Sequence, residues 1–256
     1  MIYDTHCHLN DPNMIDNIDC FLENCKKQDV SLLNVIGYDV ESSKKAIEIA
    51  NKYENCYAVV GMQPEEIPNE EFYEELDALY DNNRIVAVGE IGLDYHWTKE
   101  NKDKQKEVFV HYIKKAHQLN LPIVVHSRDA HLDTINILKE NKEYLGKVVM
   151  HCYSYSKEVL KDYLNLGCYI SLGGVVTFKN AKVAKEVASV VPLDRLMLET
   201  DSPYLTPTPY RGKPNEPSYI RFVLEEIAKL KEMDVNELED ILFKNSCSFF
   251  NVKCEK

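Results

Sequence analysis

The chain has 256 residues, of which 45% are hydrophobic and 28% are charged. A chain of this size and balance can bury a large core, and no linker or low-complexity tract divides it, so we expect a single domain over residues 1–256. The formal net charge of −12 argues against a broad basic surface for duplex nucleic acid. Any polyanionic substrate is therefore expected to bind at one local site.

The sequence carries no signal for export or membrane insertion. Its first residues lack the basic and apolar regions of a signal peptide, and no apolar run approaches the roughly 18 residues that span a bilayer. The cysteines include no Cys-x-x-Cys pair, which predicts reduced thiols. We therefore expect a soluble, cytoplasmic protein that does not bind membranes, with a monomer as the default oligomeric state.

Short apolar runs rich in valine and isoleucine predict eight strands. In chain order they are residues 2–5, 31–37, 56–61, 84–89, 121–125, 147–150, 168–172 and 195–198. Nearly continuous apolar runs of this kind are typical of parallel strands that are buried on both faces. Helical periodicity predicts helices over residues 40–53, 70–81, 104–120, 130–141, 156–167, 218–233 and 235–250. The last helix is preceded by Asp234, a candidate N-cap.

The alternation of strands and helices predicts an α/β fold of the (β/α)8 TIM-barrel type. A doubly wound open sheet is the alternative, but that fold normally has a glycine-rich phosphate loop after its first strand. Here the first strand runs into the sequence THCH at residues 5–8 instead. The barrel is therefore the preferred interpretation.

Polar side chains follow several of the predicted strands. They are His6, His8, Glu90, His126, His151 and Asp201. Because the carboxyl ends of barrel strands meet at one face, these side chains are expected to lie together. Imidazole and carboxylate groups are the donors that divalent metals prefer. The sequence therefore predicts a metal site at this face.

Six donors exceed what one tetrahedral ion uses, so we expect two divalent ions, Mg, Mn or Zn, that share Glu90 as a bridge. Such a pair is typical of hydrolases, which makes Glu90 and Asp201 the candidate catalytic residues. Asp201 is expected to bind metal and to take the proton from an attacking water. Cys7 and Cys152 each neighbour a histidine donor, and their thiols are expected to face the opposite side of their strands.

Six short motifs follow one another from residue 4 to residue 220. They are DTHCHL (4–9), VGEIGLDY (88–95), LPIVVHSRDA (121–130), HCYS (151–154), LETDSPYLTP (198–207) and RGKPNEPSYI (211–220). In this order they resemble the TatD-related deoxyribonucleases, metal-dependent hydrolases of the amidohydrolase-like barrel superfamily. The resemblance implies a (β/α)8 fold, two or more divalent ions, and hydrolysis of phosphodiester bonds in DNA from strand ends. It also places the family's metal positions on the six donors above.

One position departs from the family pattern. The family usually has Gly-x-His-Pro after the third strand, whereas this chain has GMQP, with Gln63 in place of the histidine. Glutamine can donate to a phosphate oxygen or hold a water molecule, but it cannot shuttle a proton near neutral pH. The departure predicts that this chain differs from the family in its rate, its metal preference or its substrate.

Substrate contacts are expected from Arg128, Arg211, Lys213 and Gln63. Arg128 follows a donor histidine by two residues and offers bidentate geometry to a phosphate, although a salt bridge at the barrel top is an equal alternative. Arg211 and Lys213 lie in a segment that is either a substrate-binding loop or a solvated one. The aromatic run at residues 95–97 is a weaker candidate for base stacking.

Two alternatives to a nuclease remain open from the sequence. A small-molecule amidohydrolase or lactonase would use the same barrel, but those relatives often have a bridging lysine where this chain has Glu90. A non-catalytic protein that binds metal or nucleic acid is the other alternative. It is favoured only by Gln63 and is opposed by the intact set of donors.

Overall fold

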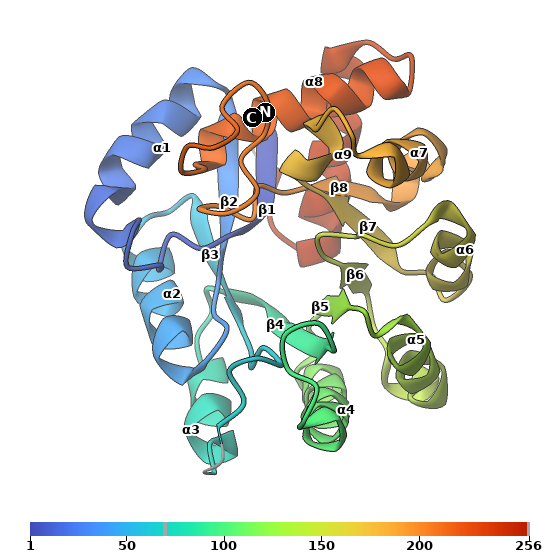
Figure 1. Ribbon diagram of the computed structural model, residues 1–256. Coiled ribbons are helices and arrows are strands. Elements are labelled where there is room, and N and C mark those ends of the chain that lie inside the picture. The colour runs from blue at the N-terminus through green and yellow to red at the C-terminus, as the bar shows by residue number, and fades with distance from the viewer. Residues whose placement is uncertain (69–70, 255–256) are drawn as a thin grey trace.

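The structure is a computed structural model that describes residues 1–68 and 71–254. Eight parallel strands follow one another in chain order, and Figure 1 shows helices α1 to α8 arranged around them. The strands are β1 (Ile2–Cys7), β2 (Val30–Ile36), β3 (Cys56–Val60), β4 (Ile85–Asp94), β5 (Ile123–Arg128), β6 (Val148–Met150), β7 (Tyr169–Leu172) and β8 (Leu196–Leu198). The predicted (β/α)8 TIM barrel is confirmed.

Each predicted helical segment contains a helix, although within the predicted segment 70–81 the α-helix spans only Tyr73–Asp77 and continues as a 3-10 turn over Ala78–Tyr80. The helices are α1 (Ile18–Lys27), α2 (Val40–Lys52), α3 (Tyr73–Asp77), α4 (Lys102–Leu119), α5 (His131–Glu140), α6 (Lys157–Asn165), α7 (Lys182–Val190), α8 (Ile220–Leu230) and α9 (Val235–Phe250). Helices α1 and α7 were not predicted, and residue 70 of the predicted segment 70–81 lies outside the described residues. Within residues 1–68 and 71–254, no helix is both long enough and apolar enough to cross a membrane.

Aspartate side chains define the first turns of two helices. At α2, Asp39 Oδ1 accepts the backbone N–H of Ser42 at 2.6 Å, and Ser42 Oγ accepts the N–H of Asp39 at 2.9 Å, which makes a reciprocal capping box. At α9, Asp234 Oδ1 accepts the N–H groups of Asn236 and Glu237. The N-cap predicted at Asp234 is confirmed.

Backbone hydrogen bonds close the barrel between its last and first strands. The N–H of Asp201, just after β8, donates to the carbonyl oxygen of His6 at 2.9 Å. The N–H of His8 donates in turn to the carbonyl oxygen of Ser202 at 2.8 Å. The same bonds that close the barrel therefore hold Asp201 beside His6 of β1 and beside His8, which follows that strand.

Alternate residues of several strands face the inside of the barrel, as the two-residue period of a strand requires. Val124, Val149 and Met197 belong to a buried cluster together with phenylalanines of α9, whereas the residues on either side of each belong to a second cluster that includes the helices. Two residues beyond each of these positions lie His126, within β5, and His151 and Glu199, which directly follow β6 and β8. The strand period thus directs polar side chains to the interior at the carboxyl end.

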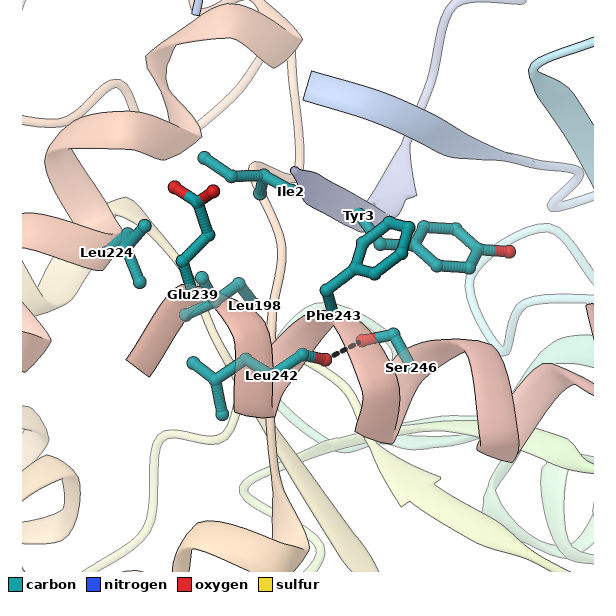
Figure 2. A pocket seen from close by; sticks show the side chains of 8 residues that line it. All are labelled: Ile2, Tyr3, Leu198, Leu224, Glu239, Leu242, Phe243 and Ser246. Atoms are coloured by element: carbon teal, nitrogen blue, oxygen red, sulfur yellow. Dashed lines mark hydrogen bonds between the residues drawn. The ribbon is translucent and has the colours of Figure 1, made fainter. Parts of the chain in front are cut away.

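The amino-terminal end of the barrel is filled by side chains of α9. Figure 2 shows Phe243 beside Tyr3, at the edge of a small cavity of about 10 Å³. A space of that size holds no more than about one water molecule. Glu239 also lines this cavity and forms an ion pair with Arg221, at 2.6 Å between Oε2 and Nη1. The packing and the ion pair at the amino-terminal end of the barrel therefore stabilise the fold.

Strand β4 continues to Asp94, whereas the sequence predicted its end at residue 89. Gly92 explains the difference, because it has φ of +144° and pairs with His126 of β5. A Cβ atom at Gly92 would lie 2.0 Å from the carbonyl oxygen of His126. The glycine therefore permits the close approach of the two strands and keeps Glu90 within a strand.

Gly92→Ala is expected to lower the free energy of unfolding by more than about 2 kcal/mol, because it combines an unfavourable φ with a steric overlap. Urea denaturation measures this change. Gly167→Ala is the control, since Gly167 also has a positive φ, of +81°, but a Cβ there would meet nothing within 4 Å. Equal losses in both variants would show that the overlap contributes nothing.

Candidate metal centre and cleft

A cleft with a volume of about 710 Å³ opens at the carboxyl ends of the strands. Clefts of this size are typical of small-molecule and cofactor sites. Five of the six predicted donors line it: His8, Glu90, His126, His151 and Asp201. The sixth donor, His6, is only 1% exposed.

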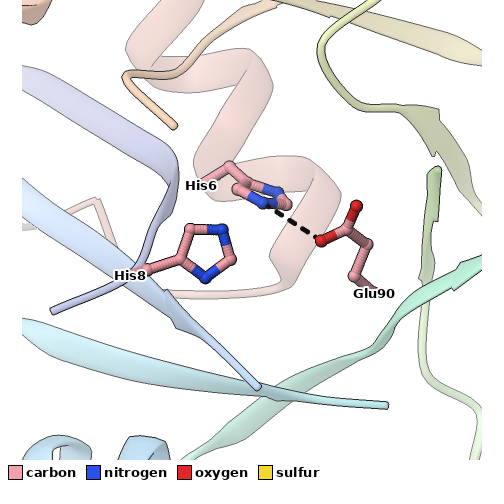
Figure 3. A group of neighbouring side chains, drawn as sticks. All are labelled: His6, His8 and Glu90. Atoms are coloured by element: carbon pink, nitrogen blue, oxygen red, sulfur yellow. Dashed lines mark ion pairs between the residues drawn. The ribbon is translucent and has the colours of Figure 1, made fainter. Parts of the chain in front are cut away.

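The donors at the end of β1, His6 and His8, lie against donors from β4 and from the segment after β8. Figure 3 shows His6, His8 and Glu90 converging, with His6 Nε2 at 3.6 Å from Glu90 Oε2. Asp201 Oδ1 lies 3.7 Å from His6 Nε2 and 3.3 Å from His8 Nε2. Segments almost 200 positions apart in the sequence thus form one group of side chains.

Glu90 also joins these donors to those of β5 and β6. Its Oε1 lies 2.8 Å from Nδ1 of His126 and 2.9 Å from Nε2 of His151. The ring of His151 stacks on that of His6, with ring centroids 3.8 Å apart and an angle of 11° between the planes. Glu90 is therefore the carboxylate that contacts donors on both sides of the barrel. All six predicted donors are brought together.

The donor set fits divalent metal ions. Three sets of three side chains each place one donor atom within 4.8 Å of the others: His6–His8–Glu90, Glu90–His126–His151 and His6–His151–Glu199. The first two sets share Glu90, as expected of a bridging ligand. Both ring nitrogens of His6 are buried and have no hydrogen-bond partner in the described part of the chain. A bound cation would satisfy such a nitrogen, so several His and Glu residues are positioned to bind metal.

Burial and mutual contacts set the charge of this group. Burial, together with the nearby His151, holds the pKa of His6 well below its usual range, so the imidazole is neutral, as a metal ligand must be. Burial opposes ionisation of Glu90, but its contacts with His151 and His126 keep its pKa well below the usual value. Burial likewise opposes charging of His126, whose hydrogen bonds to Asp94 and Glu90 raise its pKa to about 9.

The two cysteines beside donor histidines differ from each other. Cys7 is buried, and its Sγ lies 3.2 Å from the carbonyl oxygen of Asn34, so its thiol faces away from the cleft as predicted. The prediction is wrong for Cys152, which lines the cleft. Strand β6 ends at Met150, and Cys152 adopts a left-handed conformation with φ of +43°, so the alternation of a strand no longer applies there. Among the described residues, no three-residue donor set includes either thiol.

Two buried carboxylates at the site were not predicted. Asp94 Oδ2 lies 2.9 Å from Nε2 of His126, and Glu199 Oε1 lies 3.6 Å from Nδ1 of His151. A signal for both was present, because Asp94 lies four residues after Glu90 on β4 and Glu199 lies two residues after Met197 on β8. Each therefore shares the inner face of its strand.

Two of the predicted substrate contacts lie at the cleft. Gln63 follows β3, lines the cleft and donates from Nε2 to Glu65 Oε2 at 3.4 Å. Arg128, at the end of β5, also lines the cleft, and its guanidinium lies 5.5 Å from the ring centroid of Trp97. Both side chains are within reach of a bound molecule, and their contact with substrate stays a prediction.

The other two predicted contacts lie outside the described lining of the cleft. The guanidinium of Arg211 lies 4.0 Å from the ring centroid of Phe178. The Nζ atom of Lys213 lies 5.5 Å from the ring centroid of Tyr210. Their role in substrate binding also stays a prediction.

The aromatic run at residues 95–97 divides into separate environments. The ring of Tyr95 is buried, and its hydroxyl donates to Asp133 at 2.6 Å, so the prediction of base stacking is wrong for this residue. His96 pairs with Asp129, at 2.9 Å between Nδ1 and Oδ2. Trp97 lines the cleft and is 65% exposed. Base stacking stays a prediction for His96 and Trp97.

Known proteins are similar to this chain in both sequence and fold. The model of the family described as "TatD related DNase" matches residues 3–251. YabD of Bacillus subtilis, named an uncharacterized metal-dependent hydrolase, is 42% identical over 254 residues, which cover 98% of this chain and 100% of YabD. YcfH of Escherichia coli, named in the same way, is 36% identical over 258 residues, which cover 100% of this chain and 97% of YcfH.

A solved structure agrees with this relationship. The crystal structure of YjjV, a TatD homologue from Escherichia coli, matches with a TM-score of 0.92 at 28% identity and covers 98% of each chain. With the metal-binding geometry of the cleft, these similarities identify a metal-dependent hydrolase. The chain belongs to the TatD-related DNase family.

Proposed function

We propose that the protein is a divalent-metal-dependent deoxyribonuclease that hydrolyses phosphodiester bonds from the ends of DNA strands. The observation that carries the proposal is the convergence of six donor side chains, five of which line one cleft: His6, His8, Glu90, His126, His151 and Asp201. The family model supports the choice of DNA as substrate, because it is described as a DNase family.

The six donors would hold two divalent ions, with Glu90 shared between them. Bound there, the ions supply a water of lowered pKa and neutralise charge that develops on a phosphoryl oxygen. Asp201, at the open side of the donor group, accepts the proton of the attacking water at its carboxylate. Glu90 Oε1 lies 2.8 Å from Nδ1 of His126 and 2.9 Å from Nε2 of His151, so Glu90 would share the ions with both rings.

The charge of the cleft supports a role for bound cations in holding a phosphodiester. Carboxylates among the described lining residues are Glu65, Glu66, Glu90, Asp94 and Asp201, whereas Arg128 is the only lysine or arginine there. A polyanion would be repelled by this cleft without metal, so its phosphate must be held by the ions together with Arg128. Trp97, beside Arg128, offers a surface on which a terminal base can stack.

The test is degradation of DNA by metal-stripped protein after Mg, Mn or Zn is added back. Single-stranded and duplex DNA are labelled at the 3′ or the 5′ end, and Glu90→Ala is assayed beside the wild type. Loss of nucleotides from one end that depends on metal and is absent in the variant is the expected result. Intact DNA with every metal, from protein shown to be folded and metal-loaded, would refute the proposal and favour a small-molecule hydrolase.

Gln63→His is expected to raise the turnover of DNA by roughly 10-fold or more, because an imidazole at the cleft can transfer a proton where an amide cannot. The measurement is kcat on labelled DNA. Gln63→Asn is the matched control, since it keeps an amide of similar polarity and is expected to bring no gain. An unchanged rate in Gln63→His would show that Gln63 does not limit the enzyme.

A further inference from the structure

Glu199 is a buried carboxylate that the predicted metal centre does not use. It follows β8 directly, is 0% exposed and lies outside the described lining of the cleft, so it does not contact a bound substrate. A carboxylate with no access to water must interact with neighbouring groups. Its neighbours therefore indicate its role.

Two groups lie close to this carboxylate. Glu199 Oε1 accepts the backbone N–H of Cys152 at 2.6 Å and lies 3.6 Å from Nδ1 of His151. Glu199 Oε2 and His151 Nδ1 are both buried, and neither has a hydrogen-bond partner in the described part of the chain. A ring nitrogen without a partner thus lies beside a carboxylate whose second oxygen still has its capacity to accept a hydrogen bond.

The other ring nitrogen of His151 points toward the metal donors, with Nε2 at 2.9 Å from Glu90 Oε1. His151 therefore lies between two carboxylates, Glu90 in the cleft and Glu199 behind it. The same arrangement occurs at His126, which contacts Glu90 through Nδ1 and Asp94 through Nε2. The stacking of His6 on His151 fixes the plane of the ring but not which nitrogen carries the proton.

We propose that Glu199 is a positioning residue that fixes the orientation and the tautomer of His151. Its carboxylate accepts the Nδ1–H of the imidazole, so that the lone pair of Nε2 is directed to the metal position beside Glu90. Carboxylates that hold a histidine ligand in this way also raise its basicity toward the metal. The inference rests on the proposed metal centre and concerns the affinity of that centre.

The experiment compares the wild type with Glu199→Gln by calorimetric titration of metal-stripped protein with Mn²⁺. The introduced amide keeps the size of the side chain and can still accept the N–H of Cys152, but it is a weaker acceptor for His151. We expect the variant to bind Mn²⁺ about 10- to 100-fold more weakly. Equal affinities in a folded variant would overturn the inference.

Glu239→Gln is the matched control, because Glu239 is a partly buried carboxylate paired with Arg221 at the opposite end of the barrel. It is expected to lower the unfolding temperature and to leave Mn²⁺ affinity unchanged. A purely structural role of Glu199 predicts this same result for Glu199→Gln. If the wild type itself bound no Mn²⁺, the proposed metal centre and the inference would both be wrong, whereas a negative DNA assay alone would affect only the nuclease.

A second measurement does not depend on the folding of a variant. Nitrogen-15 NMR of the Zn²⁺-loaded wild type reports which nitrogen of His151 carries the proton. The inference requires a protonated Nδ1 and a metal-bound Nε2. A metal-bound Nδ1, or a proton on Nε2, would overturn it.

Discussion

Glu90→Ala is expected to abolish metal binding and hydrolysis together. Glu90 belongs to two of the three donor sets and lies within 2.9 Å of ring nitrogens of His126 and His151, so its loss removes a ligand that the donors from several strands share. Loss even of groups that only orient ligands costs about 10- to 100-fold, so we expect the rate to fall by more than about 100-fold. Inductively coupled plasma mass spectrometry measures the bound metal, and an assay of the hydrolysis rate measures the loss of activity.

Two further variants complete this prediction. His6→Ala is expected to lose metal and activity in the same way, since His6 shares a donor set with His8 and Glu90. Glu66→Ala is the control for bound metal, because Glu66 lines the cleft but belongs to none of the sets. Full metal content in Glu90→Ala would contradict the bridging role of Glu90.

Asp201→Asn is expected to reduce turnover far more than it reduces bound metal. The amide keeps an oxygen that can coordinate a cation but cannot accept a proton near neutral pH. Removal of a general base typically costs roughly 100- to 10,000-fold in rate. The experiment measures kcat and metal content on the same preparation. Unchanged turnover in Asp201→Asn would show that another group accepts the proton.

The sequence predicted the barrel and its donors because the two-residue period of each strand determines which side chains face the interior. Parallel pairing then brings the carboxyl ends of all the strands to one face. Any polar residue that continues the inner face of a barrel strand must meet its counterparts from other strands, as His126 and His151 do. Helices α1 and α7 were missed. Helices as short as these are marginal by themselves and depend on packing against the barrel. Their length and uncapped first turns do not distinguish them from α5 and α6, which were predicted.

Parts of the site depend on contacts that a strand pattern does not contain. The left-handed conformation of Cys152 reverses the face that alternation predicts, and it places this thiol in the cleft. Gly92 extends β4 beyond its apolar run, and Asp94 reaches His126 only because of that extension. Arg211 contacts Phe178, which is distant in the sequence, and Lys213 contacts Tyr210 within the same loop. The periodicity of strands and helices predicts neither contact.

The position of Trp97 gives this chain an intrinsic optical probe. It is the only tryptophan in the sequence, and it lies exposed at the cleft beside the guanidinium of Arg128. Emission excited selectively in the indole therefore comes from the cleft alone, with no background from the rest of the barrel. A base that stacks on the ring would quench this fluorescence, so occupancy of the cleft can be followed in unlabelled protein, even in variants that no longer turn over.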